Sequence, residues 1–268
     1  MTSAPVPSAR TEAAAATAAA SRASRAERTP GGSNWRRYLP GAFGIAYVAA
    51  WAAGLAAWPV NLALNATASQ VAASHRTHPA EATVQYLLVE GLAGLLLGAV
   101  LAAALLSASR GRTAARTGAV ALGAAAVSVS VSQCVVGLFL TAAATGHKVT
   151  RSGALFDVFN RLDGVKMLAL AGVALLIGTS MNLPVALPRW LRAVSVSLAA
   201  ALVASGYAYL SLTNALAWIA FISGPLLLLW VAAMGITMAA RRMRPTPRAG
   251  KPGRPGKSSQ PARGSSNV

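Results

Sequence analysis

The feature that most constrains this chain is a series of six long apolar runs. They lie at about residues 40–62, 86–108, 117–143, 166–187, 190–212 and 214–239. Each holds about 20 or more mainly apolar residues, enough for a helix to cross a hydrocarbon core of about 30 Å. The runs are apolar on all sides and do not alternate as barrel strands do. We therefore predict an all-α integral membrane bundle of six transmembrane helices.

The charge of the chain predicts its orientation. Lysine and arginine number 24 against 6 acidic residues, a formal net charge of +18. In a soluble chain this excess would indicate nucleic acid binding, but here the bases cluster in short segments beside the apolar runs. Nineteen lie on one side of the predicted bundle and five on the other. The positive-inside rule then places both termini in the cytoplasm, and we expect no specific nucleic acid partner.

The segments outside the apolar runs have the composition of disordered chain. Residues 1–38 are rich in Ala, Ser, Thr and Arg, and residues 241–268 have Pro and Gly every few positions together with eight bases. Such segments bury too little apolar surface to fold alone. We predict disordered cytoplasmic tails at 1–38 and 241–268 around a transmembrane domain at 39–240. The basic tails should contact anionic lipid of the inner leaflet, and no particular protein partner follows.

Glu90 is the ionisable residue that the sequence places inside an apolar run, which makes it a candidate for function. We expect it about four residues inside the outer end of the second span. There it faces the bundle interior, within reach of Gln133 or of an outer-loop base such as Arg161. Polar side chains need partners in lipid, so we predict an outward-facing polar pocket formed by Glu90, Gln133, Tyr207, Asn214, Arg161 and Asp163. The alternative is an interfacial anchor whose carboxylate reaches the headgroups.

The stretch 154–163 predicts a short amphipathic helix between the third and fourth spans. Its apolar side chains share one face at helical spacing: Leu155, Phe156, Phe159 and Leu162. Asp157 with Arg161 is an i,i+4 pair, and Asp163 with Lys166 is an i,i+3 pair. We expect this helix to lie in the outer interface and to lead into the fourth span, either as a passive interfacial helix or as a lid over the pocket.

Pro225 predicts a kink in the sixth span, because proline lacks a backbone donor and clashes with the carbonyl four residues earlier. Broken helices mark binding sites in many transporters, although prolines also kink purely structural spans. Metalloprotease, serine hydrolase and NTPase motifs are missing from the sequence. The three histidines, His75, His78 and His147, have poor spacing for a metal site. We expect no enzyme activity, no cofactor and no metal.

Three segments carry a resemblance: FNRLDGVKM at 159–167, SGPLLLLW at 223–230 and HRTHPAE at 75–81. In their Ala- and Arg-rich setting they resemble uncharacterised small multi-pass membrane proteins of high-GC bacteria. The similarity covers roughly 40–240, implies a bacterial plasma-membrane location and supplies no activity or functional residue. We expect a multi-pass protein that binds or passes a small solute. The alternative is a non-transporting accessory or scaffold subunit of a membrane assembly.

Overall fold

The computed structural model describes residues 38–60, 62–106, 114–179 and 188–243. The regular structure of these residues is entirely helical, and six of the helices are long and apolar enough to cross a membrane, which confirms the predicted all-α bundle. The predicted tails fall almost wholly outside the described residues. The spans are Leu39–Ala57 (α2), Pro79–Leu106, Ala114–Thr145 (α6), Val149–Thr179 (α7), Arg189–Ser211 (α8) and Ala220–Met243 (α9).

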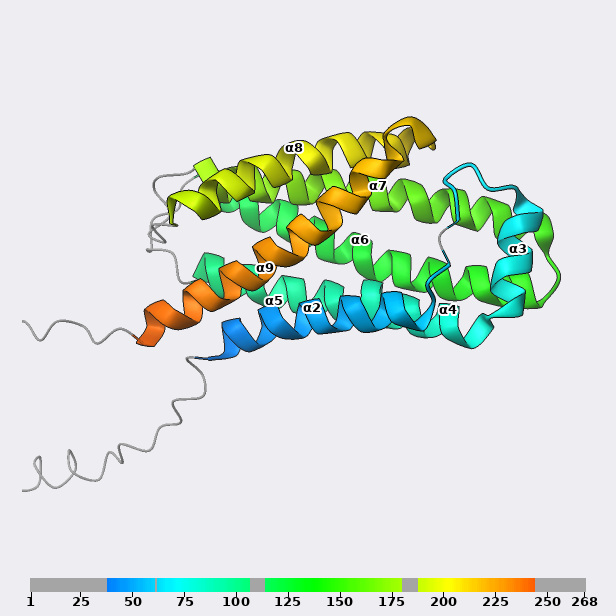
Figure 1. Ribbon diagram of the computed structural model, residues 1–268, viewed down its shortest axis with the longest axis horizontal. Helices are drawn as coiled ribbons and strands as arrows, with labels where there is room; N and C mark the ends of the chain where they lie inside the picture. Colours follow the sequence, from blue (N-terminus) through cyan, green and yellow to red (C-terminus); the bar gives the residue numbers. More distant parts are fainter. Residues whose placement is uncertain (1–37, 61, 107–113, 180–187, 244–268) are drawn as a thin grey trace, which may run out of the picture. The chain divides into compact units, whose positions relative to one another are not determined.

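The second span is built from three pieces, and two short helices lie between spans. Pro79–Gln85 (α4) continues into the π-helical turns Tyr86–Leu92 (η2) and then into Ala93–Leu106 (α5). Ala68–Thr77 (α3) follows α2, and the 3₁₀ helix Asn214–Ile219 (η3) precedes α9. Figure 1 shows α3 across one end of the bundle, called here the α3 end.

The core of the bundle is apolar and lies between the spans. α7 packs against both α6 and α8, while α5 packs against α2 and α6. Fully or almost fully buried side chains fill the space between them: Leu97, Val100, Val173, Leu198, Leu202, Trp230, Val231 and Met234. Small residues bring the backbones together, because helices in lipid gain close contact from packing rather than from the hydrophobic effect. The faces turned outward are apolar as well, as lipid requires.

α9 crosses the bundle obliquely from α2 to α8 (Figure 1). Away from the α3 end it touches α2 backbone to backbone: a Cβ added to Gly44 would lie 3.1 Å from the carbonyl oxygen of Val231. Near the α3 end, α2 instead faces η2, where a Cβ added to Gly54 would overlap Val89. There α9 is bound to α8 by a hydrogen bond of 3.1 Å between Ser223 and Ser205. The two helices α2 and α9 therefore form a fork that opens toward the α3 end.

The fourth span differs from the prediction. We expected a separate interfacial helix at 154–163 and a span beginning at 166, but α7 is one continuous helix from Val149. The apolar face around Phe156 and Phe159 packs against α3 and against Tyr86 of η2, in a cluster with Trp58 and Val71. That face has a protein partner, so the segment stays with the bundle and does not turn into the interface. The i,i+3 pair of Asp163 and Lys166 is present at 2.7 Å.

Pro225 lies in the second turn of α9, and the α-helix continues through it to Met243. The change in helical geometry falls earlier, where the 3₁₀ turns of η3 give way to α9 between Ile219 and Ala220. A bend of the helix axis at Pro225 stays a prediction. The proline also borders the cavity described below.

Candidate functional site

Glu90 lies in η2, deep in the second span. The π-helical geometry is seen in the N–H of Ala93, which donates to the carbonyl of Leu88 five residues earlier. Such turns are rare and are frequent at functional sites. The span begins at Pro79, seven residues before the predicted start, so Glu90 lies about 16 Å along it, against the roughly 6 Å expected. Its side chain faces the interior and is 7% exposed.

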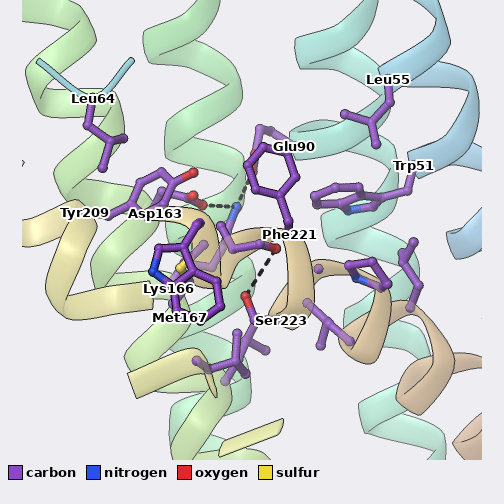
Figure 2. A pocket seen from close by; sticks show the side chains of 18 of the residues that line it. Trp51, Leu55, Leu64, Glu90, Asp163, Lys166, Met167, Tyr209, Phe221 and Ser223 are labelled. Carbon is purple, nitrogen blue, oxygen red and sulfur yellow. Dashed lines mark hydrogen bonds and ion pairs between the residues drawn. The ribbon is translucent and has the colours of Figure 1, made fainter. Parts of the chain in front are cut away.

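Glu90 forms a buried cluster with two residues of α7, called here the charge triad: Glu90, Lys166 and Asp163. The Nζ of Lys166 lies 2.7 Å from Oε2 of Glu90 and 2.7 Å from Oδ1 of Asp163. Figure 2 shows the ammonium between the two carboxylates. With all three groups ionised, the charge triad carries one net negative charge. Removing Lys166 would leave two buried carboxylates without a compensating charge.

Two side chains of α6 fix the carboxylates. The Oγ of Ser130 lies 3.0 Å from both Oε2 and the main-chain oxygen of Glu90 and donates to them. A Cβ added to Gly94 would lie 2.7 Å from this hydroxyl, so the glycine allows Ser130 to approach. The Nε2 of Gln133 donates to Oδ1 of Asp163 at 3.3 Å. The charge triad is therefore built on η2 and α7 and bound by side chains of α6.

A cavity of about 580 Å³ lies beside the charge triad, in the fork between α2 and α9. This volume is in the range of pockets that hold small molecules. All three charged side chains line it, and most of the remaining wall is apolar or aromatic (Figure 2). The aromatic lining residues are Trp51, Tyr209, Trp218 and Phe221. The cavity therefore offers an apolar space with charge concentrated on one wall.

The segment after α2 closes part of the mouth of the cavity. Leu62, Ala63 and Leu64 line it. Asn214 at the start of η3 holds this segment: its Oδ1 accepts from the N–H of Leu64 at 3.2 Å, and its Nδ2 donates to Oδ1 of Asn65 at 2.6 Å. The mouth also includes the exposed side chain of Phe221. Asn214 therefore ties this part of the lining to η3.

The structure brings together part of the predicted pocket. Glu90, Asp163 and Asn214 line the cavity, and Gln133 is buried behind it, bonded to Asp163 instead of Glu90. Two predicted members lie elsewhere. Tyr207 is 61% exposed, because two positions along a helix separate it from Tyr209, which lines the cavity.

The second residue outside the site is Arg161. It is exposed on α7 and does not line the cavity, because its position on the helix turns it away from α5 and α9. The base that meets Glu90 is Lys166, which the sequence paired only with Asp163. The sequence did not predict the aromatic side chains Trp51, Trp218 and Phe221 in the wall of the cavity. Lys166 could have been found from its place at the very start of the fourth apolar run.

A second buried polar group, His75, lies at the α3 end outside the spans. Its Nδ1 donates to the carbonyl of Val71 at 2.9 Å, and its Nε2 accepts from the hydroxyl of Tyr86 at 2.8 Å. Burial lowers the pKa of His75, so the neutral form is favoured. The other two histidines point to different partners: His78 to Glu81 at 3.6 Å and His147 to Arg76 at 3.0 Å. His75, in contact with the rings of Trp58 and Tyr86, packs α3 onto the bundle.

The site combines a cavity of ligand size, an apolar wall and three charges. This combination is suited to binding a small molecule that has both an apolar body and a polar group. No protein-family model, curated protein or solved structure matches this chain, so its function has to be inferred from the chemistry of this site.

Proposed function

We propose that this multi-pass membrane protein binds a small amphipathic solute in the cavity between α2 and α9. The observation that carries the proposal is the position of the charge triad, which borders an open volume of about 580 Å³ instead of packed side chains. Ionisable side chains inside membrane spans are costly and generally mark ligand or ion sites. The wide turn η2 at Glu90 adds support, because π-helical turns are frequent at such sites.

A purely structural role for the charge triad accounts for less of the geometry. Buried ion pairs are a weak source of stability, since apolar residues of similar volume often replace them without loss. A structural clamp between α5 and α7 would also be expected to pack closed. The carboxylates of Glu90 and Asp163 instead share the wall of the cavity with four aromatic side chains. A ligand explains both the charges and the space beside them.

We also propose that the protein lies in a bacterial plasma membrane with the α3 end facing the cell exterior. We propose further that its role is binding of the solute, with or without its passage, and not catalysis. The orientation rests on the distribution of bases, of which Arg116, Arg189 and Arg192 lie at the opposite end of the spans. The binding role rests on the lining, where within the described residues neither histidine nor cysteine occurs.

The test is whether small water-soluble molecules reach the cavity. In a Cys134→Ala background, single cysteines are placed at Met167, which lines the cavity, and at Leu175, which is exposed on the same helix outside it. The protein in phosphatidylcholine nanodiscs is treated with a small methanethiosulfonate, which reacts with the hydrated thiolate. Met167→Cys should react and Leu175→Cys, facing lipid, should not.

Equal and slow reaction at both positions in folded protein would mean that the cavity is closed to solutes. The proposal would then be wrong, and a non-transporting accessory or scaffold role would be favoured. Circular dichroism and gel filtration of both variants show whether they are folded.

A further inference from the structure

The charges that line the cavity do not balance. Two carboxylates, those of Glu90 and Asp163, share one ammonium, that of Lys166, and no other charged side chain lies among the described lining residues. With both carboxylates ionised, a ligand that enters this space meets one surplus negative charge. In surroundings of low dielectric constant, the sign of this charge discriminates strongly between ligands.

Each carboxylate also has an oxygen to spare. Lys166 and Ser130 bind Oε2 of Glu90, and Lys166 and Gln133 bind Oδ1 of Asp163. Oε1 of Glu90 and Oδ2 of Asp163 accept no hydrogen bond from the described residues. Behind them the Oε1 of Gln133 is fully buried and accepts none either. The carboxylates of the site therefore offer hydrogen-bond acceptors that no described residue uses.

The wall around the charge triad is aromatic. Trp51, Tyr209 and Phe221 line the cavity from α2, α8 and α9 (Figure 2). Trp218 of η3 lines it as well. The face of an aromatic ring attracts a cation, most strongly where water is excluded. The same rings and the neighbouring leucines can cover an apolar ligand body. Surplus negative charge, spare acceptors and aromatic faces all favour the same class of ligand.

Other ligand classes fit this lining less well. An anion would need a cation that is not already neutralised, whereas Lys166 is bound by two carboxylates. A neutral polar solute such as a sugar would need several free donors and acceptors, whereas most of the described wall is hydrocarbon. A bare metal ion would leave the apolar part of the cavity unused.

We infer that the cavity selects an amphipathic organic cation, whose ammonium is bound by the spare carboxylate oxygens, Oε1 of Glu90 and Oδ2 of Asp163, and whose apolar or aromatic body lies against Trp51 and Phe221. The inference rests on the proposed function and names the ligand class for the same cavity. The inference specifies both the charge and the apolar body of the ligand. Two matched comparisons test it directly.

The first comparison varies the ligand and leaves the protein unchanged. The full chain in phosphatidylcholine nanodiscs is titrated with 4-phenylbutylammonium, with its neutral N-acetyl derivative and with the anion 5-phenylpentanoate. All three have the same phenyl group and the same four methylene groups. Binding is measured by calorimetry and by tryptophan fluorescence, with empty nanodiscs subtracted. The cation should bind at least about tenfold more tightly than either partner, as expected for charge-assisted hydrogen bonds.

The second comparison varies the protein. Glu90→Gln and Asp163→Asn each remove the surplus charge and should weaken binding of the cation about tenfold or more. Asp157→Asn is the matched control, because Asp157 is exposed on the same helix outside the cavity. This control should bind as the unaltered protein does. If one of the site variants does not fold, the other and the ligand series still decide.

Equal binding of the cation, the neutral derivative and the anion would overturn the inference, and so would equal weakening by Asp157→Asn and Glu90→Gln. These outcomes are separate from failure of the proposed function. If Met167→Cys reacts with the methanethiosulfonate but the cation does not bind preferentially, the cavity admits solutes of another class. If Met167→Cys is unreactive, both proposals fail.

Discussion

Lys166 is the single cation of the charge triad, and it pairs with both carboxylates. Its Nζ lies 2.7 Å from Glu90 and 2.7 Å from Asp163, and its side chain is 12% exposed. Two buried carboxylates without this ammonium would repel each other and lose hydration at the same time. At the scale of the residue, the charge balance of the charge triad therefore depends on this one ammonium.

Lys166→Met should lower the free energy of unfolding by about 3–5 kcal/mol, the usual cost of removing one partner of a buried ion pair. Reversible unfolding in mixed micelles measures the change. Lys148→Met removes the same charge from an exposed position at the α3 end and should have little effect. Equal stability of the two variants would show that the carboxylates of Glu90 and Asp163 are not held as ions by Lys166.

His75 predicts a pH dependence of stability at the α3 end. Burial lowers its pKa in the folded protein, whereas the unfolded chain has the ordinary value of about 6.5. Above that pH His75 is neutral in both states and its contribution is fully present. As the pH falls below about 6.5, the unfolded state takes up the proton first, so the free energy of unfolding decreases.

Thermal unfolding at pH 8 and pH 5.5 tests this dependence. His75→Gln should reduce the difference between the two pH values, because the titrating ring is gone. His78→Gln, at an exposed histidine three residues along the chain, should retain the full difference. Equal behaviour of the two variants would assign the pH dependence to other groups.

Helices in this bundle meet at glycines, and these contacts determine where the cavity forms. α7 and α8 cross where a Cβ added to Gly164 would lie 2.8 Å from the carbonyl oxygen of Gly206. α2 and α9 cross where a Cβ added to Gly235 would overlap the carbonyl oxygen of Pro40. α2 and α9 touch at one end, whereas at the α3 end α2 packs against η2 and α9 against α8. The fork that holds the cavity is a consequence of both.

Gly235→Ala should destabilise the bundle by about 1–3 kcal/mol, because the added methyl group meets backbone that cannot rotate away. Gly224→Ala is the matched control in the same helix, since nothing lies within 4 Å of its added Cβ. There alanine should be neutral or stabilising by up to about 1 kcal/mol through its better helix propensity. Unfolding of both variants in mixed micelles gives the comparison. A Gly235→Ala variant as stable as Gly224→Ala would contradict the close crossing of α2 and α9.

At the scale of the whole molecule, the six spans and the bases around them predict both termini in the cytoplasm. In a Cys134→Ala background, Ser69→Cys and Thr150→Cys lie at exposed positions of the α3 end. An impermeant maleimide applied to intact cells should label both and should not label Ser265→Cys. All three should be labelled after permeabilisation. Labelling of Ser265→Cys in intact cells would reverse the orientation and would place the mouth of the cavity in the cytoplasm.

The sequence by itself determined the class of the protein and the number of its spans. Insertion into lipid depends on the composition of one run of about 20 residues, and that composition can be read without knowing any neighbour. The pair of Asp163 and Lys166 could be predicted for the same reason, since i,i+3 spacing is a local property of a helix. Glu90 was identified because an ionisable side chain is conspicuous within an apolar run.

Only the tertiary structure decided which groups meet at the site. Glu90 and Lys166 are 76 positions apart, and their contact depends on how α6 packs against both η2 and α7, with Ser130 next to Gly94. The face of α8 that turns Tyr209 inward and Tyr207 outward depends on its crossing with α7. The aromatic wall exists because α2 and α9 diverge. Which side chains meet depends on how the surfaces of helices distant in sequence pack together. The periodicity of a single segment does not encode that packing.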